Sequence, residues 1–486
     1  MNSVIEQVKL NAEKYGDKTA IYDEKGSITF SELWKAASGF ASYLKTLGLP
    51  AGSRVMIKAA PEIPTFVAYF GIHLAGLTNV PCERTAGPEA LTLIADDIDA
   101  ALIIADIELP EGYKRFDYAE ITKTAEQHYD PDAVFTAVEP ENVCDILFTT
   151  GTTGKSKGVM ISNRALKASC ENIICGSPIT EDTVYLIPVP INHANGIRKS
   201  YATIYAGATL VLIDGLQNLR KFYDAVEKYH AKYLLLPPSA VRMLLLLSAK
   251  ELSKYADQIE LVHTSAAPFP EADKLKLCEL LPKTKLVFAY GSSEVANVSM
   301  FDYSKYPGRI CCVGSLNVNS KVKIVDEDGN EIESSQENQG LIVLGGNAVM
   351  TGYFNAPELT AGVLKDGWVK TNDIGYFDED GFLYVLGRAD DVINVGGLKI
   401  APTEVENVVM QYPGIAECAC FGIDDRMTGK APKLIYVPER KVQIDLADFR
   451  NFLASKMEAY KIPKKIEAVT EIPKTSNGKI NRKILK

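Results

Sequence analysis

The chain has 486 residues, more than a single hydrophobic core usually supports, so at least two domains are expected. Hydrophobic residues make up 47% of it and charged residues 23%, values that argue against a disordered, collagen-like or membrane protein. The net charge of −10 disfavours a large nucleic-acid-binding surface, because binding a phosphate backbone requires an excess of Lys and Arg.

The N-terminal stretch MNSVIEQVKLNAEKYGDK is polar and lacks the apolar segment of a signal peptide. The longest apolar stretch, Tyr233 to Ser248, is interrupted by prolines and by Arg242, so it is too short for a membrane span. Nine cysteines without a repeated CxxC spacing predict neither a disulfide framework nor a structural zinc site. We therefore expect a cytoplasmic protein with no membrane span.

From Arg54 onward, short β-branched runs alternate with longer amphipathic runs. In chain order these runs are RVMIKA, IPTFVAYFGIHLAGL, ATLVLI, NLRKFYDAVEKYH, AKYLLLPP, SAVRMLLLLSAK, IELVHT and KLVFAY. Such alternation is typical of parallel sheets covered by helices, and it predicts an α/β core over roughly the first 300 residues.

After about Met300 the sequence changes to strands joined by Asp-Gly turns, at Gly329 and Gly381, which predicts antiparallel β structure. From Asp391 to the end, mixed α and β structure is expected. The elements predicted there are a helix at Pro402–Tyr412, strands at Ala416–Gly422 and Pro432–Val437, and a helix at Leu446–Met457. We place the domain boundary at residues 387–390.

The most informative segment is Asp145 to Val159, DILFTTGTTGKSKGV, an apolar strand that leads into a loop rich in Thr, Gly and Lys. Glycines let the backbone N–H groups approach a phosphate, and hydroxyls and lysines add donors and charge. The alternative, a flexible surface turn, does not require so many of these residues. GKS at Gly154 to Ser156 also imitates the end of a P-loop, although Thr149 stands where that motif has glycine, so a P-loop NTPase stays open.

TTGTTGKSKGV closely resembles the signature loop of the superfamily of acyl-CoA synthetases, luciferases and peptide-synthetase adenylation domains. Thr150 and Ser156 replace the Ser and Pro that are usual there. The resemblance implies that the loop binds the β- and γ-phosphates of ATP. The implied residues are Thr149, Thr150, Gly151, Thr152, Thr153, Gly154, Lys155 and Lys157.

FAYGSSE, Phe288 to Glu294, resembles the superfamily's Tyr-Gly-x-Thr-Glu segment. The resemblance implies that Tyr290 lies against adenine, that Ser293 reaches the α-phosphate and that Glu294 holds Mg²⁺. Phe288 departs from the Asn or Gln that many members carry, so backbone carbonyls would have to read adenine. The preceding HTSAAP resembles a turn beside the adenine and acyl pocket, which small residues would line: Ala266, Ala267, Gly291, Ser292 and Ala296, with Ser265 narrowing it.

Two later segments extend the resemblance. TNDIG, Thr371 to Gly375, implies that Asp373 binds the ribose hydroxyls, a role that suits a carboxylate because it only accepts hydrogen bonds. GRADD implies that Arg388 contacts the ribose or a phosphate and that Asp390 is a hinge.

The last two motifs concern the two half-reactions. INVGGLKIAPTEVE implies a loop whose Gly396 and Gly397 line the tunnel for pantetheine, and Pro402 there is independently typical of a helix start. The terminal GKINR implies that Lys479 bridges the attacking carboxylate and the α-phosphate, although composition alone would favour a solvated basic tail.

Specificity is less well determined. VPINHANG lacks the Asp that amino-acid-activating members carry, and His193 stands where acyl- and aryl-CoA synthetases have a gating histidine, so we expect an acid without a free α-amine. Arg198 could pair with the distal carboxylate of a diacid, but an exposed helix arginine is the favoured interpretation.

Together the motifs identify the chain as a member of this superfamily. They imply an α/β fold with a large N-terminal domain (residues 1–387) of two helix-covered sheets plus a β-barrel, a hinge (388–390) and a small mobile α+β domain (391–486). The implied activity is an ATP- and Mg²⁺-dependent carboxylic acid–CoA ligase that forms an acyl-AMP. Transfer to a carrier-protein phosphopantetheine, a P-loop-type NTPase and a non-catalytic nucleotide-binding relative are the alternatives.

Overall fold

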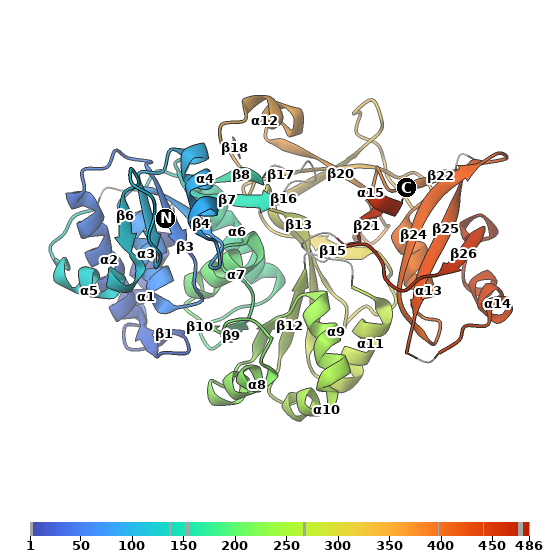
Figure 1. The fold of residues 1–486 in the computed structure, drawn as a ribbon, viewed down its shortest axis with the longest axis horizontal. Helices are drawn as coiled ribbons and strands as arrows, with labels where there is room; N and C mark the ends of the chain where they lie inside the picture. The colour runs from blue at the N-terminus through green and yellow to red at the C-terminus, as the bar shows by residue number, and fades with distance from the viewer. Residues whose placement is uncertain are drawn as a thin grey trace.

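A computed structural model of the protein describes residues 3–135, 138–150, 156–265, 269–396, 398–440, 442–474 and 480–485, with the side chains of residues 150, 156 and 483 outside that description. Figure 1 shows three regions along the chain: the N-terminal part in blue, a central part in green and yellow, and the C-terminal part in orange and red. Each of them is built on a β-sheet.

The first sheet has seven strands, of which the last five in spatial order run parallel and the first two pair antiparallel. In spatial order they are β18 (Gly352–Tyr353), β8 (Ser156–Ser162), β7 (Val143–Thr150), β4 (Thr78–Cys82), β3 (Arg54–Lys58), β5 (Leu102–Ala105) and β6 (Arg115–Asp117). The helices of this region are α1 (Val4–Lys14), α2 (Phe30–Thr46), α3 (Ile63–Leu74), α4 (Pro88–Ile98) and α5 (Ile121–Gln127), with η1 (Tyr118–Glu120). β3 and β4 are almost wholly buried, as expected for strands covered on both faces.

The second sheet has 14 strands and changes direction at β13 (Lys285–Ser292). On one side of β13 follow the parallel strands β12 (Leu261–Ser265), β11 (Tyr233–Leu235), β9 (Val184–Ile187), β10 (Thr209–Leu212) and β1 (Thr19–Tyr22), with β2 (Ser27–Thr29) at the edge. On the other side the pairing is antiparallel: β14 (Ala296–Asp302), β15 (Cys312–Leu316), β21 (Leu383–Arg388), β20 (Trp368–Phe377), β17 (Gly340–Gly346) and β16 (Ser320–Val325), with β19 (Leu364–Lys365) and α12 (Pro357–Val363) nearby. The antiparallel part predicted after about Met300 thus begins at β14, and it packs around its own apolar cluster.

Helices α6 (Asn163–Gly176) and α7 (Ala194–Tyr205) lie between the two sheets. Their apolar side chains belong to one core cluster that includes strands of both sheets. The other face of the second sheet is covered by α8 (Leu219–Lys228), α9 (Pro238–Leu247) and α11 (Glu271–Leu280), with α10 (Ala249–Leu252) and η2 (Ser253–Tyr255). Because α7 has sheets on both sides, even its polar residues are largely buried.

The last region has its own five-stranded sheet and its own core cluster. Its elements are β22 (Ile393–Val395), β23 (Leu398–Ile400), α13 (Pro402–Val409), β24 (Ile415–Asp425), β25 (Gly429–Pro438), α14 (Leu446–Lys456), η3 (Ala459–Lys461), β26 (Lys465–Ala468) and α15 (Arg482–Leu485). The two helices and two strands predicted here are all present. The proline predicted to start a helix, Pro402, is the first residue of α13.

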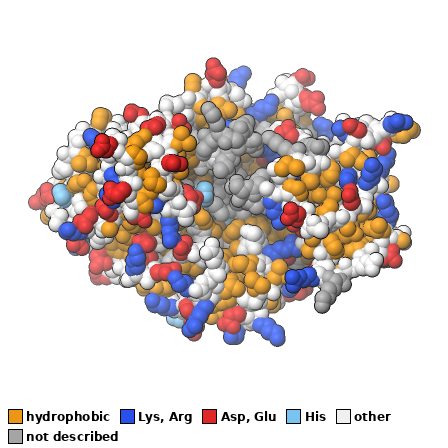
Figure 2. Space-filling view, in the orientation of Figure 1, with side chains coloured by type: hydrophobic (Ala, Val, Ile, Leu, Met, Phe, Trp, Pro, Cys, Tyr) orange, Lys and Arg blue, Asp and Glu red, His pale blue; other side chains and the backbone are white. Residues whose placement is uncertain are grey.

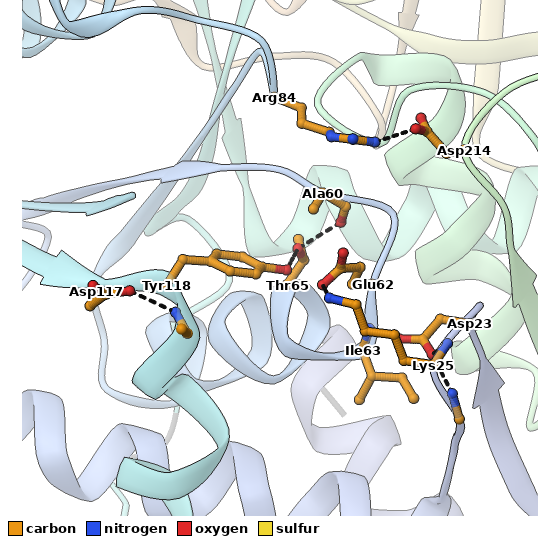
Figure 3. Close-up of polar contacts among 12 residues, drawn as sticks. Asp23, Lys25, Ala60, Glu62, Ile63, Thr65, Arg84, Asp117, Tyr118 and Asp214 are labelled. Atoms are coloured by element: carbon orange, nitrogen blue, oxygen red, sulfur yellow. Dashed lines mark hydrogen bonds and ion pairs between the residues drawn. The ribbon is translucent and has the colours of Figure 1, made fainter. Parts of the chain in front are cut away.

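Contacts between the two large sheets fix the loops that follow their strands (Figure 3). Arg84, just after β4, forms an ion pair with Asp214, just after β10. The carboxylate of Asp23, just after β1, accepts a hydrogen bond of 2.9 Å from the backbone of Ile63 at the start of α3. The ends of strands from both sheets are therefore held in one place.

On the face in Figure 2, acidic and basic side chains are interspersed over most of the surface. Within the described residues, no helix is long and apolar enough to cross a membrane.

Candidate active site

The β7–β8 hairpin carries the predicted phosphate-binding loop. Thr149 on β7 pairs with Lys157 on β8. The Lys157 ammonium lies 5.4 Å from the centre of the Tyr353 ring on β18. The other predicted loop positions, or their side chains, lie outside the described residues: Thr150, Gly151, Thr152, Thr153, Gly154 and Lys155.

The same hairpin argues against the P-loop alternative. In a P-loop, the glycine-rich turn leads from a strand into a helix whose N-terminus faces the phosphates. Here the turn leads from β7 into β8, an antiparallel partner strand, and the next helix of the described chain is α6, which begins at Asn163. The loop therefore connects two strands of a hairpin.

Tyr290, Asp373 and Arg388 come together from β13, β20 and β21. The Tyr290 hydroxyl donates a hydrogen bond of 2.7 Å to Asp373 Oδ2, and Arg388 Nη1 lies 3.8 Å from Asp373 Oδ1. Asp373 and Arg388 are also partners in the strand ladder. Burial, followed by the charge of Asp373, raises the pKa of Tyr290 well above its usual value, so the phenol remains a hydrogen-bond donor.

Glu294 follows β13 and lies beside β18. The Tyr353 hydroxyl donates a hydrogen bond of 2.8 Å to Glu294 Oε1, so Tyr353 lies between this acid and Lys157. Burial, followed by the Glu294 charge, raises the pKa of Tyr353. Sequence reasoning missed Tyr353, which is 59 residues from Glu294 in the chain and lies in no motif that we used.

The end of β13 is open to solvent. Gly291 and Ser292 are exposed, and Ser293 and Glu294 are half-buried. A Cβ atom at Gly291 would lie 1.7 Å from the carbonyl oxygen of Ala296, so glycine is required for the ladder between β13 and β14. Of the other predicted pocket residues, Ala266 and Ala267 lie outside the described residues.

The expected exposure of Arg198 is wrong. This residue of α7 is only 3% exposed, and its guanidinium donates hydrogen bonds of 3.0 Å and 2.6 Å to the backbone carbonyls of Ser292 and Ser293. The physical reason is that α7 lies between two sheets, so the helix face that would meet solvent on a surface helix meets β13 instead. Burial lowers the pKa of Arg198 to about 10, although the charge of Glu294 opposes this.

His193 is the residue that immediately precedes α7, and its side chain is 54% exposed. Its Nε2 atom lies 3.6 Å from Glu83 Oε2, and Asn192 donates a hydrogen bond of 3.1 Å to the same oxygen. Glu83 adjoins Arg84, which is tied to Asp214 (Figure 3). Sequence reasoning missed Glu83 because its contacts come from a segment more than 100 residues away.

The segment between the second and third sheets carries the remaining predicted positions. Asn372 donates a hydrogen bond of 2.6 Å to Asp390, the predicted hinge residue. Gly396 has a φ of +60°, a region that favours glycine, and its N–H donates to the carbonyl of Thr428 at 2.9 Å. Gly397 and Lys479 lie outside the described residues.

Comparisons with known proteins find relatives that match nearly the whole chain. A 2-succinylbenzoate–CoA ligase of Bacillus licheniformis is 27% identical over 486 residues, which cover 98% of each chain. A feruloyl-CoA synthase of Amycolatopsis sp. is 28% identical over 471 residues, covering 95% of this chain and 94% of the relative. Among solved structures, apo MatB of Rhodopseudomonas palustris has the same fold, with a TM-score of 0.86, 24% identity and coverage of 100% of this chain and 98% of that one.

Two family models match the chain and together span most of it. The model described as AMP-binding enzyme matches residues 8–354, and the model described as AMP-binding enzyme C-terminal domain matches residues 404–479. The first match alone covers more than half of the sequence, so the chain belongs to the AMP-binding enzyme family.

Proposed function

We propose that this protein is an AMP-forming acid–CoA ligase. In the first step a carboxylate oxygen of the acid attacks the α-phosphorus of ATP, and the bond to pyrophosphate breaks. In the second step the thiol sulfur of coenzyme A attacks the acyl carbon, the bond to AMP breaks and the thiol loses its proton. The observation that carries the proposal is the convergence of Tyr290, Asp373, Glu294 and Lys157 at the open end of β13, in a chain of the AMP-binding enzyme family.

In the nucleotide-binding half of the site, different residues are proposed to contact the adenine, the ribose and the phosphates of ATP. Asp373 is positioned by the Tyr290 hydroxyl, which leaves its second carboxylate oxygen toward Arg388 and available for the ribose hydroxyls. Tyr290 offers its ring to adenine, and Arg388 adds positive charge beside the ribose. Lys157 and the loop before it face the phosphates. We propose that Ser293, Glu294 and Lys479 contact the reacting groups in the first step; Lys479 lies outside the described residues.

The proposal includes a Mg²⁺ ion bound by Glu294. Glu294 suits a cation ligand because Tyr353 binds one carboxylate oxygen, while the other has no partner in the described part of the chain. A hard cation such as Mg²⁺ prefers carboxylate and phosphate oxygens. When bound, it would neutralise the charge that develops on pyrophosphate. Arg198 donates to the backbone carbonyls of the two residues before Glu294 and so helps to position the Glu294 carboxylate.

The acceptor is proposed to be coenzyme A, because the curated relatives that match nearly the whole chain are named as CoA ligases or synthases. The acid reaches the site past His193, whose side chain is exposed and adjoins Glu83. Between the two steps, residues 391–486 would turn about a hinge at residues 388–390. This rotation would break the hydrogen bond between Asn372 and Asp390. It would also bring Gly396 and Gly397 to the pantetheine.

The test is ATP–pyrophosphate exchange over a panel of fatty, aromatic and dicarboxylic acids, followed by thioester formation with coenzyme A. Lys479→Ala should reduce exchange by about 10²-fold or more, since it removes a positive charge from the transition state. The same variant should convert preformed acyl-AMP to acyl-CoA much less impaired. Release of ADP instead of AMP, or equal losses in both steps, would contradict the proposal.

A further inference from the structure

Helix α7 buries two adjacent cations, and within the described residues neither forms an ion pair with a carboxylate. Arg198 donates through both terminal nitrogens to backbone carbonyls, while its buried Nε atom has no described partner. Lys199 is 1% exposed, and its ammonium donates to amide oxygens only, Asn195 Oδ1 at 2.7 Å and Asn297 Oδ1 at 3.3 Å. Within the described residues, no carboxylate forms an ion pair with Lys199.

A buried ammonium without a counter-anion is unfavourable, and proteins normally pair such a charge. Burial, followed by the charge of Arg198, lowers the pKa of Lys199 to about 7. Near neutral pH the group is therefore divided between the ammonium and the neutral amine, and the charged form lowers the stability of the fold. Such an arrangement is expected where the missing anion belongs to a ligand.

Two polar atoms near Lys199 also lack hydrogen-bond partners among the described residues. Asn297 uses its oxygen for Lys199, while its buried Nδ2 group has no hydrogen-bond partner among the described residues. His263, which is fully buried, contacts Ser177 through Nδ1 at 3.1 Å, and its Nε2 atom likewise has no described partner. Burial and the charge of Lys199 lower the pKa of His263, so a neutral imidazole faces the ammonium. A cation and an amide donor thus lack an acceptor.

This buried polar cluster adjoins the side of the site where the acid is expected. Asn195 is two residues beyond His193, and its oxygen also accepts a hydrogen bond of 2.8 Å from Ser265 at the end of β12. Asn297 pairs with Gly291 at the solvent-open end of β13. The carboxyl ends of parallel strands are where α/β sheets bind their ligands.

We propose that Lys199, with Asn297 beside it, binds a second carboxylate at the far end of the acid, so that the substrate is a dicarboxylic acid. This inference rests on the proposed function and specifies its substrate class. The distal carboxylate accepts from the Lys199 ammonium and from Asn297 Nδ2, and so supplies the anion and the acceptor that this buried polar cluster lacks. Arg198, which the sequence offered for this role, uses both terminal nitrogens to bind the carbonyls of Ser292 and Ser293.

The experiment measures acid-dependent pyrophosphate release for aliphatic and aromatic dicarboxylic acids, each paired with its monomethyl ester and with the monocarboxylic acid of equal length. The wild-type kcat/KM for the best diacid should exceed that of its matched partners by about 100-fold or more, because the site would otherwise leave buried donors unpaired. Lys199→Met should bring this ratio close to 1. Lys283→Met, at an exposed lysine on the far side of the second sheet, is the matched control and should preserve the ratio.

Asn297→Asp provides a second test that keeps the lysine. It places a carboxylate beside Lys199, so the ratio should again fall, and retained ATP binding would show that the variant is folded. A wild-type preference for the monoacids, or a ratio that survives both substitutions, overturns the inference alone. Absence of acid-dependent pyrophosphate release with every acid overturns the proposed function and the inference with it.

Discussion

Two buried polar clusters contact helix α7, and they differ in the groups that contact their charged side chain. In the first, Asp145 Oδ1 lies 3.0 Å from His73 Nε2, 3.0 Å from Asn79 Nδ2 and 3.4 Å from the Tyr201 hydroxyl, so the acid is surrounded by donors. In the second, Lys199 has only neutral oxygens. Both clusters contact the same helix and are buried. The difference in their partners therefore suggests a structural role for the Asp145 cluster and a ligand-binding role for the Lys199 cluster.

The contrast follows from the energetics of buried charge. A buried ion with well-placed partners is strongly destabilised when one partner is removed, whereas an ion without a counter-ion destabilises the fold by its presence. The Asp145 cluster joins β7, β4 and α3 to α7, within the hairpin that carries the predicted phosphate-binding loop. We therefore expect mutations in the first cluster to lower stability, and mutations in the second to change substrate selection.

The largest effect is expected for Asp145→Ala. Removing the carboxylate leaves the His73, Asn79 and Tyr201 donors unpaired in the core, which should lower the free energy of unfolding by about 3–5 kcal/mol. Thermal denaturation monitored by circular dichroism measures this. Asp145→Asn retains a carbonyl acceptor and should lose clearly less. An alanine variant as stable as the wild type would remove the structural half of the comparison.

Arg198→Met should have the next largest effect, on catalysis with every acid. The substitution removes two hydrogen bonds from a charged group to the carbonyls of Ser292 and Ser293, worth about 1.5–3 kcal/mol each in related cases. Glu294, the next residue, should lose its position, and kcat/KM should fall about 10²-fold with diacids and monoacids alike. Arg198→Lys is the control that keeps the charge. Losses confined to diacids would make Arg198 the specificity residue in place of Lys199.

The sequence predicted the fold better than the environment of α7. Strand and helix alternation, the Asp-Gly turns and Pro402 all depend on local patterns, and the elements they predicted are present. One face of α7 is apolar and carries Ile197, Tyr201 and Ile204, while its other residues are mostly polar, a pattern typical of a surface helix whose polar residues meet solvent. They are buried here because both sheets cover the helix and because Ser200 and Thr203 bond to carbonyls one turn back, at 3.0 Å and 2.7 Å.

The sequence predicted candidate site residues only where each residue lies inside a recognisable motif. Tyr290, Asp373 and Arg388 come from different motifs, yet the structure brings them into contact. Tyr353 and Glu83 were missed because each acts through one long-range contact that no local pattern announces. The depth of Lys199 likewise depends on the packing of the sheets around it.

A smaller effect, of opposite sign to Asp145→Ala, is expected for the stability of Lys199→Met. Replacing an unpaired buried ammonium with an apolar side chain of similar length should leave the free energy of unfolding unchanged or raise it by about 1 kcal/mol or more. The thermal midpoint of the apo protein measures this. A marked loss of stability would mean that Lys199 is structural, as Asp145 is.

The last prediction is a pH dependence confined to diacids. The pKa of Lys199 is lowered to about 7, so the free enzyme loses this cation as the pH rises through that value, while a bound carboxylate holds the proton. The KM of the diacid should therefore rise by up to about tenfold per pH unit above pH 7, and the KM of the matched monoacid should not. Arg198 stays protonated over this range, and His263 is kept neutral by burial, so neither should mimic the effect. Parallel pH profiles for both acids would show that the distal carboxylate does not meet Lys199.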